Sequence, residues 1–139
     1  LSAATGESVT LPTEQQWQRA GQGDDGREFP WGSDNPDETR CNWARNVDGT
    51  TPVTQYPLGA SPYGVMDLCG NVWEICRTSW ESGGTHLDGA ERRIVRGGCW
   101  VNDSPVTLMI TQRDGPHPAD TYHLFGFRCA LENGADSGQ

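Results

Sequence analysis

Hydrophobic and polar positions follow a helical period most clearly between residues 11 and 21, in the segment LPTEQQWQRAG. Thr13 and Gln16 stand at the spacing of a capping box, in which each side chain binds the backbone of the other residue. Trp17 lies on the apolar face of this segment, and Gly21 is a residue type that commonly ends helices. The pattern therefore predicts a helix over 11–21.

Four further segments alternate with the two-residue period of a strand or are rich in β-branched residues. They are GNVWEICR (70–77), RRIVRGG (92–98), VTLMITQR (106–113) and FGFRCAL (125–131). Short strands, one clear helix and long connections predict an α+β domain with modest regular structure.

The rest of the chain is rich in residues that break regular structure. Gly, Pro, Asp and Asn are frequent between residues 22 and 62, where Trp31 and Trp43 stand isolated. A loop region of this length needs anchors or ions to stay ordered. We expect one domain over residues 1–131 and a flexible polar tail over 132–139.

The charge balance is acidic, with a net charge of −9, and all ten basic residues are arginine. A nucleic-acid binder needs a basic stripe that neutralises phosphates, and the sequence has none, so no nucleic-acid partner is expected. No apolar run reaches the length of a membrane span, and no signal peptide is visible. The compartment stays open between the cytoplasm and the cell surface.

The five cysteines form no C-x-x-C pair and are odd in number: Cys41, Cys69, Cys76, Cys99 and Cys129. This argues against a closed disulfide framework and against a structural zinc site. We expect reduced thiols that pack as small apolar groups. Cys99 follows two glycines and invites a catalytic interpretation, but a reactive thiol needs a nearby cation, and Arg96 would face the opposite side of a strand.

Two stretches combine oxygen ligands with a glycine turn. In DLCGNVWE (67–74), Asp67 and Glu74 flank a Gly-Asn turn, and carboxylates beside exposed carbonyls suit a hard cation such as calcium. The alternative is that Glu74 pairs with an arginine and Asp67 caps a turn. The segment CNWARNVDGT (41–50) has a similar composition, with Asn42, Asn46 and Asp48.

Other catalytic patterns are weak. The three histidines stand at no metal-ligand spacing; His117 and His123 fall in one loop, where solvated positions are the commoner case. The sequence contains no G-x-S-x-G elbow and no phosphate loop with its lysine.

Six motifs occur in order and carry a family resemblance. They are LPTEQQWQRA (11–20), FPWG (29–32), CNW (41–43), TTPVTQYPLGASPYGVMDLCGNVWEIC (50–76), RIVRGGCW (93–100) and LFGFRCA (124–130). Together they resemble the C-terminal two-thirds of the domain shared by formylglycine-generating enzymes and sulfatase-modifying factors. The family's earlier motifs are missing, which leaves three interpretations open: a fragment, a cleaved chain, or one half of a split protein.

The resemblance implies a C-type-lectin-like α+β fold with small twisted sheets and much ordered loop. It also implies structural calcium, held around GNVWE by a side chain three residues before its Gly, two backbone carbonyls and its Glu. Those places fall on Asp67, Gly70, Val72 and Glu74. A second family site begins at the CNW motif, which makes Asn42 and the carbonyl of Trp43 candidates.

The sequence departs from the family's enzymes at the copper site. Those enzymes oxidise a substrate cysteine with copper held by two cysteines, because soft thiolates suit Cu(I). The corresponding interval, VNDSPVTLMITQ (101–112), contains no cysteine, and the expected catalytic position falls on about Pro105. Copper is therefore not expected. Cys99 stands where the family has the Ser of GGSW, which favours buried packing, and Cys129 lacks the partner that some members have.

These departures favour a non-catalytic module that binds a protein or peptide. The variable proteins of diversity-generating retroelements share the GGSW…GFR framing and diversify the residues between the motifs. Residues 101–125 would then form the binding surface, with Trp100, Val101, Asp103, Met109, Thr111, Arg113, His117, Tyr122 and His123 as contacts. This interpretation fails if the encoding genome has no reverse transcriptase and no near-identical template repeat nearby.

Two other interpretations stay open. The chain could be an enzyme of the family that acts on cysteine-containing peptides, or one with different chemistry, since some relatives take part in iron-dependent sulfur–carbon bond formation. It could also be a structural domain that stabilises a missing N-terminal fragment or a partner chain.

Overall fold

The computed structural model describes residues 2–88, 90–116 and 123–132, and its strands form two small sheets. The larger sheet has the order β4-β3-β2-β5, from Arg113–Asp114, Arg93–Arg96, Trp73–Ser79 and Phe125–Gly126. β3 is antiparallel to β2 and β4, whereas β5 runs parallel to β2. The smaller sheet pairs β1 (Val9–Thr10) with β6 (Ala130–Leu131) in antiparallel register. The mixture of short sheets and few helices confirms the predicted α+β class.

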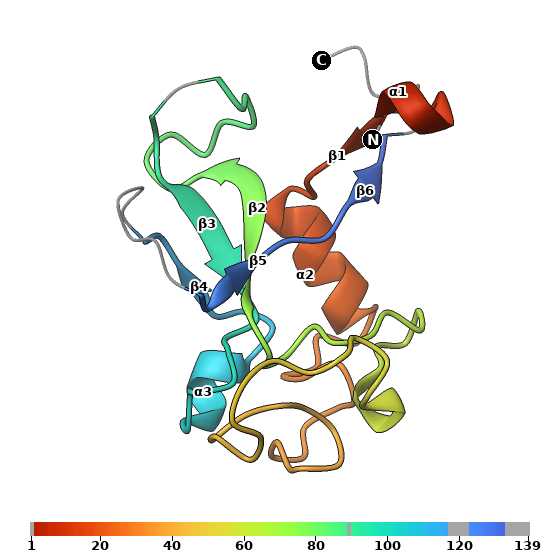
Figure 1. Ribbon diagram of the computed structural model, residues 1–139, viewed down its shortest axis with the longest axis vertical. Coiled ribbons are helices and arrows are strands. Elements are labelled where there is room, and N and C mark those ends of the chain that lie inside the picture. Colours follow the sequence, from red (N-terminus) through yellow and green to blue (C-terminus); the bar gives the residue numbers. More distant parts are fainter. Residues whose placement is uncertain (1, 89, 117–122, 133–139) are drawn as a thin grey trace.

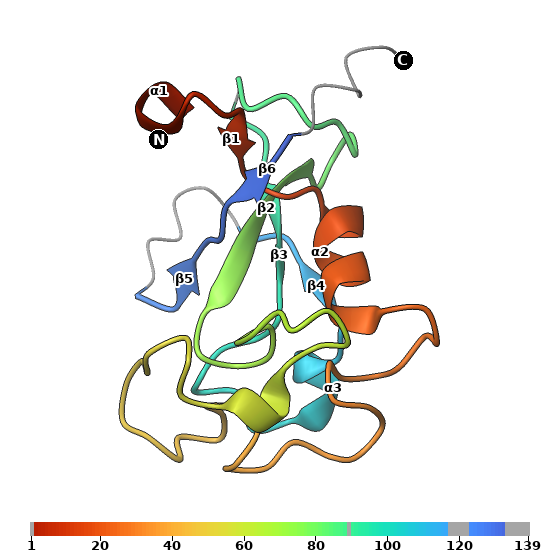
Figure 2. The ribbon, with the colours of Figure 1, turned by 90° about the vertical axis from the view of Figure 1, so that its right-hand side faces the viewer.

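Helix α2 (Glu14–Gln22) lies against β2 and β3, and the long loops that connect α2 to β2 gather at the opposite end of the molecule from the small sheet (Figure 1). Figure 2 shows α2 on one side of the larger sheet and the short helix α1 (Ser2–Thr5) beside β1. The loop region contains the 3-10 helix η1 (Pro57–Gly59). The short helix α3 (Pro105–Leu108) lies next to the loop region. The sheet and α2 thus form a frame on which the loops are held.

The capping box predicted for α2 is present. Gln16 N donates to Thr13 Oγ1 at 3.1 Å, and Thr13 N donates to Gln16 Oε1 at 2.9 Å. The predicted end at Gly21 is wrong, because the helix continues to Gln22 and is capped by Gly23 at φ 66°. Gly21 instead lies buried inside the helix, where an added Cβ would stand 2.4 Å from Ile110 Cδ1.

The strands predicted over 70–77 and 92–98 are confirmed in β2 and β3. Inward positions of β2 alternate as expected, with Glu74, Cys76 and Thr78 buried. The segment 125–131 forms two strands, β5 and β6, which belong to different sheets, so it is not one strand. Local alternation identifies extended backbone but does not specify its partner.

The strand predicted over 106–113 is wrong. Pro105 begins the helix α3, where its fixed φ suits the first helical position. Leu108 at the end of α3 and Ile110 in the turn that follows are both buried, and Ile110 N donates to Glu28 O in a loop at 2.8 Å. Leu108 and Ile110 therefore pack in the core without a strand partner, and only Arg113 of this segment enters the sheet.

The core lies between α2, β2 and the loop region. Its buried cluster consists of Trp17, Phe29, Cys41, Leu68, Cys69, Cys76, Leu108 and Ile110. Three of these eight side chains are thiols, which confirms that the cysteines pack as apolar groups. Phe29 stacks on Trp31 with ring centroids 5.3 Å apart, so aromatic residues anchor the irregular region as predicted.

A buried ion pair joins α2 to β3. Arg96 Nη2 donates to Glu14 Oε2 at 2.8 Å, and the two side chains are only 4% and 11% exposed. Arg113 of β4 donates to the other oxygen of Glu14 at 2.8 Å. Arg96 also donates to Ile110 O at 2.8 Å, so the pair fixes the path of the chain after α3.

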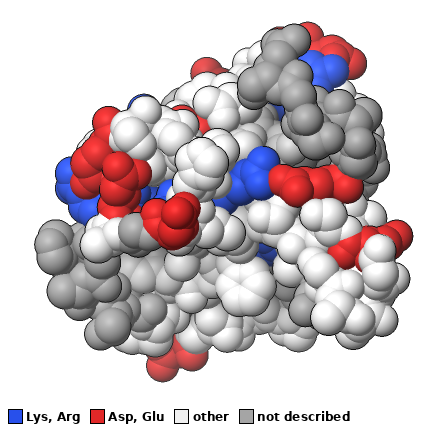
Figure 3. Space-filling view, turned by 90° about the horizontal axis from the view of Figure 1, so that it is seen from above, with Lys and Arg blue, Asp and Glu red and all other residues white. Residues whose placement is uncertain are grey.

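The structure also bears on the termini and on exposed surfaces. Glu132, assigned to the tail, donates its N–H to Ser8 O and pairs with Arg77, whereas 133–139 lie outside the described residues. None of the helices in the described part of the chain has the length and apolar character that a membrane crossing requires. The face seen in Figure 3 carries acidic and basic atoms next to one another, without a continuous basic area.

We predict that Glu14→Gln lowers the free energy of unfolding by about 3 kcal/mol, because removal of one partner leaves the buried Arg96 charge uncompensated. Urea unfolding measures this. The control is Asp24→Asn at the pair with Arg19, whose side chains are 60% and 78% exposed, and its expected cost is below about 1 kcal/mol. Equal losses in the two variants would contradict the central role of the buried pair.

Candidate functional site

The GNVWE turn is built by a run of unusual backbone conformations. Asp67, Gly70 and Asn71 adopt φ values of 61°, 76° and 62°, in the left-handed region that favours Gly and Asn. Gly70 is required for a second reason, since a Cβ there would stand 2.2 Å from Asn42 O. The turn therefore packs directly on the backbone of the CNW motif.

Asn71, which the sequence analysis did not select, joins the two predicted cation sites. Its Nδ2 donates to Asp67 Oδ2 at 2.7 Å, and its backbone N donates to Asn42 O at 2.9 Å. Asn42 Nδ2 in turn lies 3.4 Å from Asn71 Oδ1. The two stretches that appeared separate in the sequence thus belong to one hydrogen-bonded network. The tolerance of Asn for left-handed turns was the only signal for this residue.

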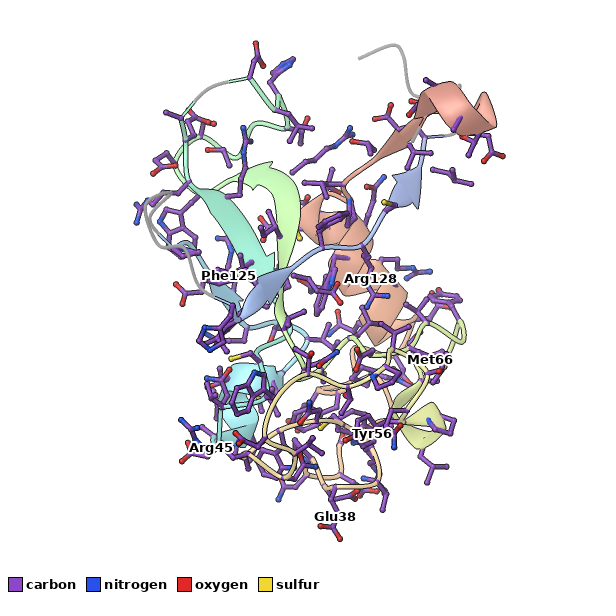
Figure 4. All side chains as sticks on the ribbon, viewed as in Figure 1. Glu38, Arg45, Tyr56, Met66, Phe125 and Arg128 are labelled. Carbon is purple, nitrogen blue, oxygen red and sulfur yellow. The ribbon has the colours of Figure 1, made fainter. Side chains whose placement is uncertain are left out.

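Glu74 is occupied by protein partners. Arg128 donates to both of its oxygens at 2.6 Å, and Trp17 Nε1 donates to Oε2 at 2.6 Å. Arg128 also donates to the carbonyls of Met66 and Asp67, and Figure 4 shows where Arg128 and Met66 lie. This geometry favours the alternative that Glu74 pairs with an arginine. Calcium ligation by Glu74 would require displacement of the Arg128 guanidinium.

Asp67 and Asn42 each have one buried oxygen without a partner among the described residues. These atoms are Asp67 Oδ1 and Asn42 Oδ1. Burial raises the pKa of Asp67 to about 6; the bond from Asn71 and the charge of Arg128 oppose this rise, and the charge of Glu74 adds to it. An unpartnered buried oxygen is costly unless it gains a ligand, so both side chains fit a hard cation.

The other carried-over ligands are backbone carbonyls. Gly70 and Val72 flank Asn71, and the Trp43 carbonyl accepts a hydrogen bond from Asn46 N at 2.9 Å. The described residues contain no group of three or more His, Cys, Asp or Glu side chains able to hold a metal. A calcium site here would therefore depend on amide and backbone oxygens as well as on Asp67.

A pocket of about 450 Å³ is lined in part by Asp67, Asn71 and Glu74. Its rim carries the exposed side chains of Val53 and Phe127, which are 64% and 67% exposed. The lining residues come from four separate stretches of the chain: Val53, Thr54, Gly64, Met66, Asp67, Asn71, Val72, Glu74, Phe127 and Arg128. A cavity of this size is within the range of sites for small ligands or partner side chains.

The predicted binding residues between 100 and 125 divide into buried and exposed sets. Trp100 is buried under Arg45, whose guanidinium carbon is 5.5 Å from the ring centroid, and Met109 packs on the core. Val101 is half-buried, and Arg113 is bound to Glu14. Asp103, Thr111 and His123 are exposed, while His117 and Tyr122 lie outside the described residues.

Arg45 is a residue of this surface that sequence reasoning missed. Its N–H donates to Trp100 O at 2.9 Å, and Ala44 N donates to Asn102 O at 2.8 Å. Ala44 and Arg45 both have positive φ, at 50° and 58°. Figure 4 shows Arg45 beside α3. No local pattern connects residues 55 positions apart, so only the folded structure brings Arg45 to Trp100.

Cys99 is a buried packing residue, as predicted. It is 1% exposed, and Asn102 Oδ1 accepts from its N–H at 2.8 Å and from its thiol at 3.2 Å. Burial raises the pKa of Cys99. The catalytic interpretation of this thiol is therefore not supported.

The other buried thiols lie within the core cluster rather than at an open site. Burial raises the pKa of Cys41 and of Cys76 to about 12, and that of Cys69 well above its ordinary value. Thiolates, not thiols, ligate metals. In the interval where the family keeps its copper ligands, Pro105 begins α3 and Leu108 is buried in the core. The residues present there do not fit a copper site.

Comparisons with known proteins agree with these motifs. The model of the sulfatase-modifying factor enzyme 1-like domain family matches residues 2–133. Hercynine oxygenase of Mycobacterium tuberculosis is 30% identical, over 88% of this chain and 32% of that protein. Inactive C-alpha-formylglycine-generating enzyme 2 of Bos taurus is 29% identical, over 93% of this chain and 46% of that protein. The chain thus spans less than half the length of these relatives.

Two solved structures share the fold. PvdO from Pseudomonas aeruginosa superposes with a TM-score of 0.78 at 24% identity, over 95% of this chain and 56% of that one. Treponema denticola variable protein 1 superposes with a TM-score of 0.68 at 26% identity, over 90% of this chain and 48% of that one.

We predict that a thiol reagent at pH 8 labels one cysteine quickly in the native protein and all five after unfolding. Cys129 is exposed, whereas the other four thiols are buried and stay protonated at that pH. Colorimetric titration counts them. Cys129→Ser should abolish the fast reaction and Cys99→Ser should leave it intact; a second fast thiol would contradict this assignment.

Proposed function

This chain belongs to the sulfatase-modifying factor enzyme 1-like domain family, and we propose that it is a non-catalytic binding module built on a C-type-lectin-like scaffold. The observation that carries the proposal is the 101–112 interval, which has no cysteine and is folded into α3 and the core. Without a thiolate pair, the oxidation of a substrate cysteine lacks its metal ligands.

The exposed part of the same region supports a role in protein or peptide binding. Asp103 and Thr111 face solvent, and Trp100 with Arg45 forms a rigid base beneath the segment that leads to them. Rigid support for exposed, chemically varied side chains is a common arrangement of binding surfaces. The resemblance to a protein named a variable protein supports the finer proposal that residues 101–125 form a diversified surface.

The name of the bovine relative, an inactive enzyme, also supports a non-catalytic role. The alternative is an enzyme of the family that acts on cysteine-containing peptides or uses other chemistry, as the hercynine oxygenase relative illustrates. Because the chain spans only part of these relatives, a half of a split or cleaved protein belongs to the same alternative.

Calcium is the proposed structural ion. At the GNVWE site Asp67 would supply Oδ1 together with the carbonyls of Gly70 and Val72, and at the CNW site Asn42 would supply Oδ1 together with the carbonyl of Trp43. Arg128 binds both carboxylate oxygens of Glu74, so this carried-over ligand has no vacant oxygen for calcium. When bound, calcium would stabilise the turn and the loop around Asn42.

We predict that the protein forms no aldehyde from a cysteine-containing peptide in the presence of copper and oxygen. Mass spectrometry of the peptide detects conversion of cysteine to formylglycine. Titration with Cu(I) should show no tight binding, because the buried thiols are not available as thiolates. Aldehyde formation together with copper binding would establish the enzyme alternative.

We predict that EDTA lowers the melting temperature, since an ion that binds only the folded state stabilises it by mass action. Asp67→Asn should lose most of the calcium-dependent gain, because it removes a ligand of one site, yet be at least as stable as the wild type in EDTA, because it removes a poorly solvated charge. Thermal unfolding with and without calcium measures both effects.

The matched control for this experiment is Asp103→Asn, which makes the same chemical change at an exposed position. It should keep the full calcium response. A melting temperature that is the same in calcium and in EDTA for the wild type would rule out the calcium site without affecting the binding-module proposal.

A further inference from the structure

Asn71 is the most connected polar residue of the candidate site. It is 5% exposed, and its left-handed backbone directs both its side chain and its backbone groups to separate partners. The side chain donates to Asp67 Oδ2 at 2.7 Å and to Thr51 O at 3.1 Å, and accepts from Thr51 N at 3.0 Å. The amide of Asn71 thus connects Asp67 to the segment at Thr51.

One arm of this network reaches Asp67. Because Asn71 Nδ2 binds Oδ2, Oδ1 is the carboxylate oxygen that has no partner in the described part of the chain. The oxygen proposed to ligate calcium is therefore positioned through Asn71.

A second arm reaches Asn42, which is fully buried. Asn42 Nδ2 binds Gly49 O at 2.8 Å and lies 3.4 Å from Asn71 Oδ1, and Asn42 O accepts from Asn71 N at 2.9 Å. Gly49 O and Asn71 Oδ1 thus accept from the Asn42 side-chain amide, whose Oδ1 has no partner among the described residues.

A third arm reaches the proposed binding segment through the backbone. Trp100 N donates to Asn71 O at 3.0 Å, and Trp100 O accepts from Arg45 N at 2.9 Å. Ordering of Asn71 therefore also orders residue 100 and Arg45, which binds residue 100 with a positive φ of 58°.

We propose that Asn71 couples the two candidate calcium sites, so that calcium fills them cooperatively and stabilises the segment at Trp100. This inference rests on the calcium part of the proposed function. An ion on Asp67 fixes the Asn71 amide, which in turn fixes Asn42, and the converse holds for an ion on Asn42. The second ion then pays less of the ordering cost, which is the physical basis of positive cooperativity.

Calcium titration by calorimetry tests the coupling. The wild type should bind two ions with a Hill coefficient above 1. Asn71→Gly removes the side-chain links but suits φ 62° and keeps both backbone hydrogen bonds, so it should bind two ions independently. Asn35→Gly makes the same change at an exposed position and should bind like the wild type.

A double-mutant cycle separates coupling from a general loss of structure. In the wild-type background, Asp67→Asn should weaken calcium at the remaining Asn42 site by about five-fold or more. In the Asn71→Gly background, Asp67→Asn should leave the affinity of that site unchanged. If the cycle shows the same loss in both backgrounds, the coupling through Asn71 is refuted.

Hydrogen exchange supplies an independent measurement that needs no second variant. Calcium should slow exchange of the Trp100 amide in the wild type and less so in Asn71→Gly. Binding of one ion or none, or calcium protection at Trp100 that is unchanged in Asn71→Gly, would overturn the inference. None of these outcomes bears on aldehyde formation, which tests the binding-module proposal separately.

Discussion

The candidate site depends on the close approach of the GNVWE turn to the backbone of Asn42. A single atom at Gly70 would prevent it, because a Cβ there would stand 2.2 Å from Asn42 O. Once the two segments are in contact, Asn71 can bind Asp67, Thr51 and Asn42 at the same time. The loop region thereby acquires order that its own composition does not supply, since it contains little regular structure.

Charged groups in this protein mainly hold elements together. Glu14 binds arginines from β3 and β4, and Glu74 binds Arg128 from the segment between β5 and β6. Both carboxylates are buried, so each of these contacts is costly to break once formed. Asp67 differs, because its buried Oδ1 lacks a protein partner among the described residues. That contrast is what distinguishes a candidate ligand from a structural carboxylate within one short motif.

The family scaffold persists in this chain, in which the interval 101–112 contains no cysteine and is folded partly into α3 and the core. Leu108 and Ile110 of this interval pack in the core, and four of the five thiols are buried. A scaffold of this kind can keep its fold while its surface takes on a different task, since function resides in sites rather than in the fold. The exposed positions around Asp103 and Thr111 are available for such a task.

The sequence alone determined the α2 cap, the strands β2 and β3, the burial of Cys99 and the family motifs, because each depends on residues near one another in the chain or on a motif. Tertiary structure alone decided that 106–113 is not a strand, that Glu74 pairs with Arg128, and that Asn71 joins Asp67 to Asn42. These outcomes depend on partners from distant segments. A local pattern indicates which side chains will be buried or hydrogen-bonded, but only the folded chain specifies the group that each of them contacts.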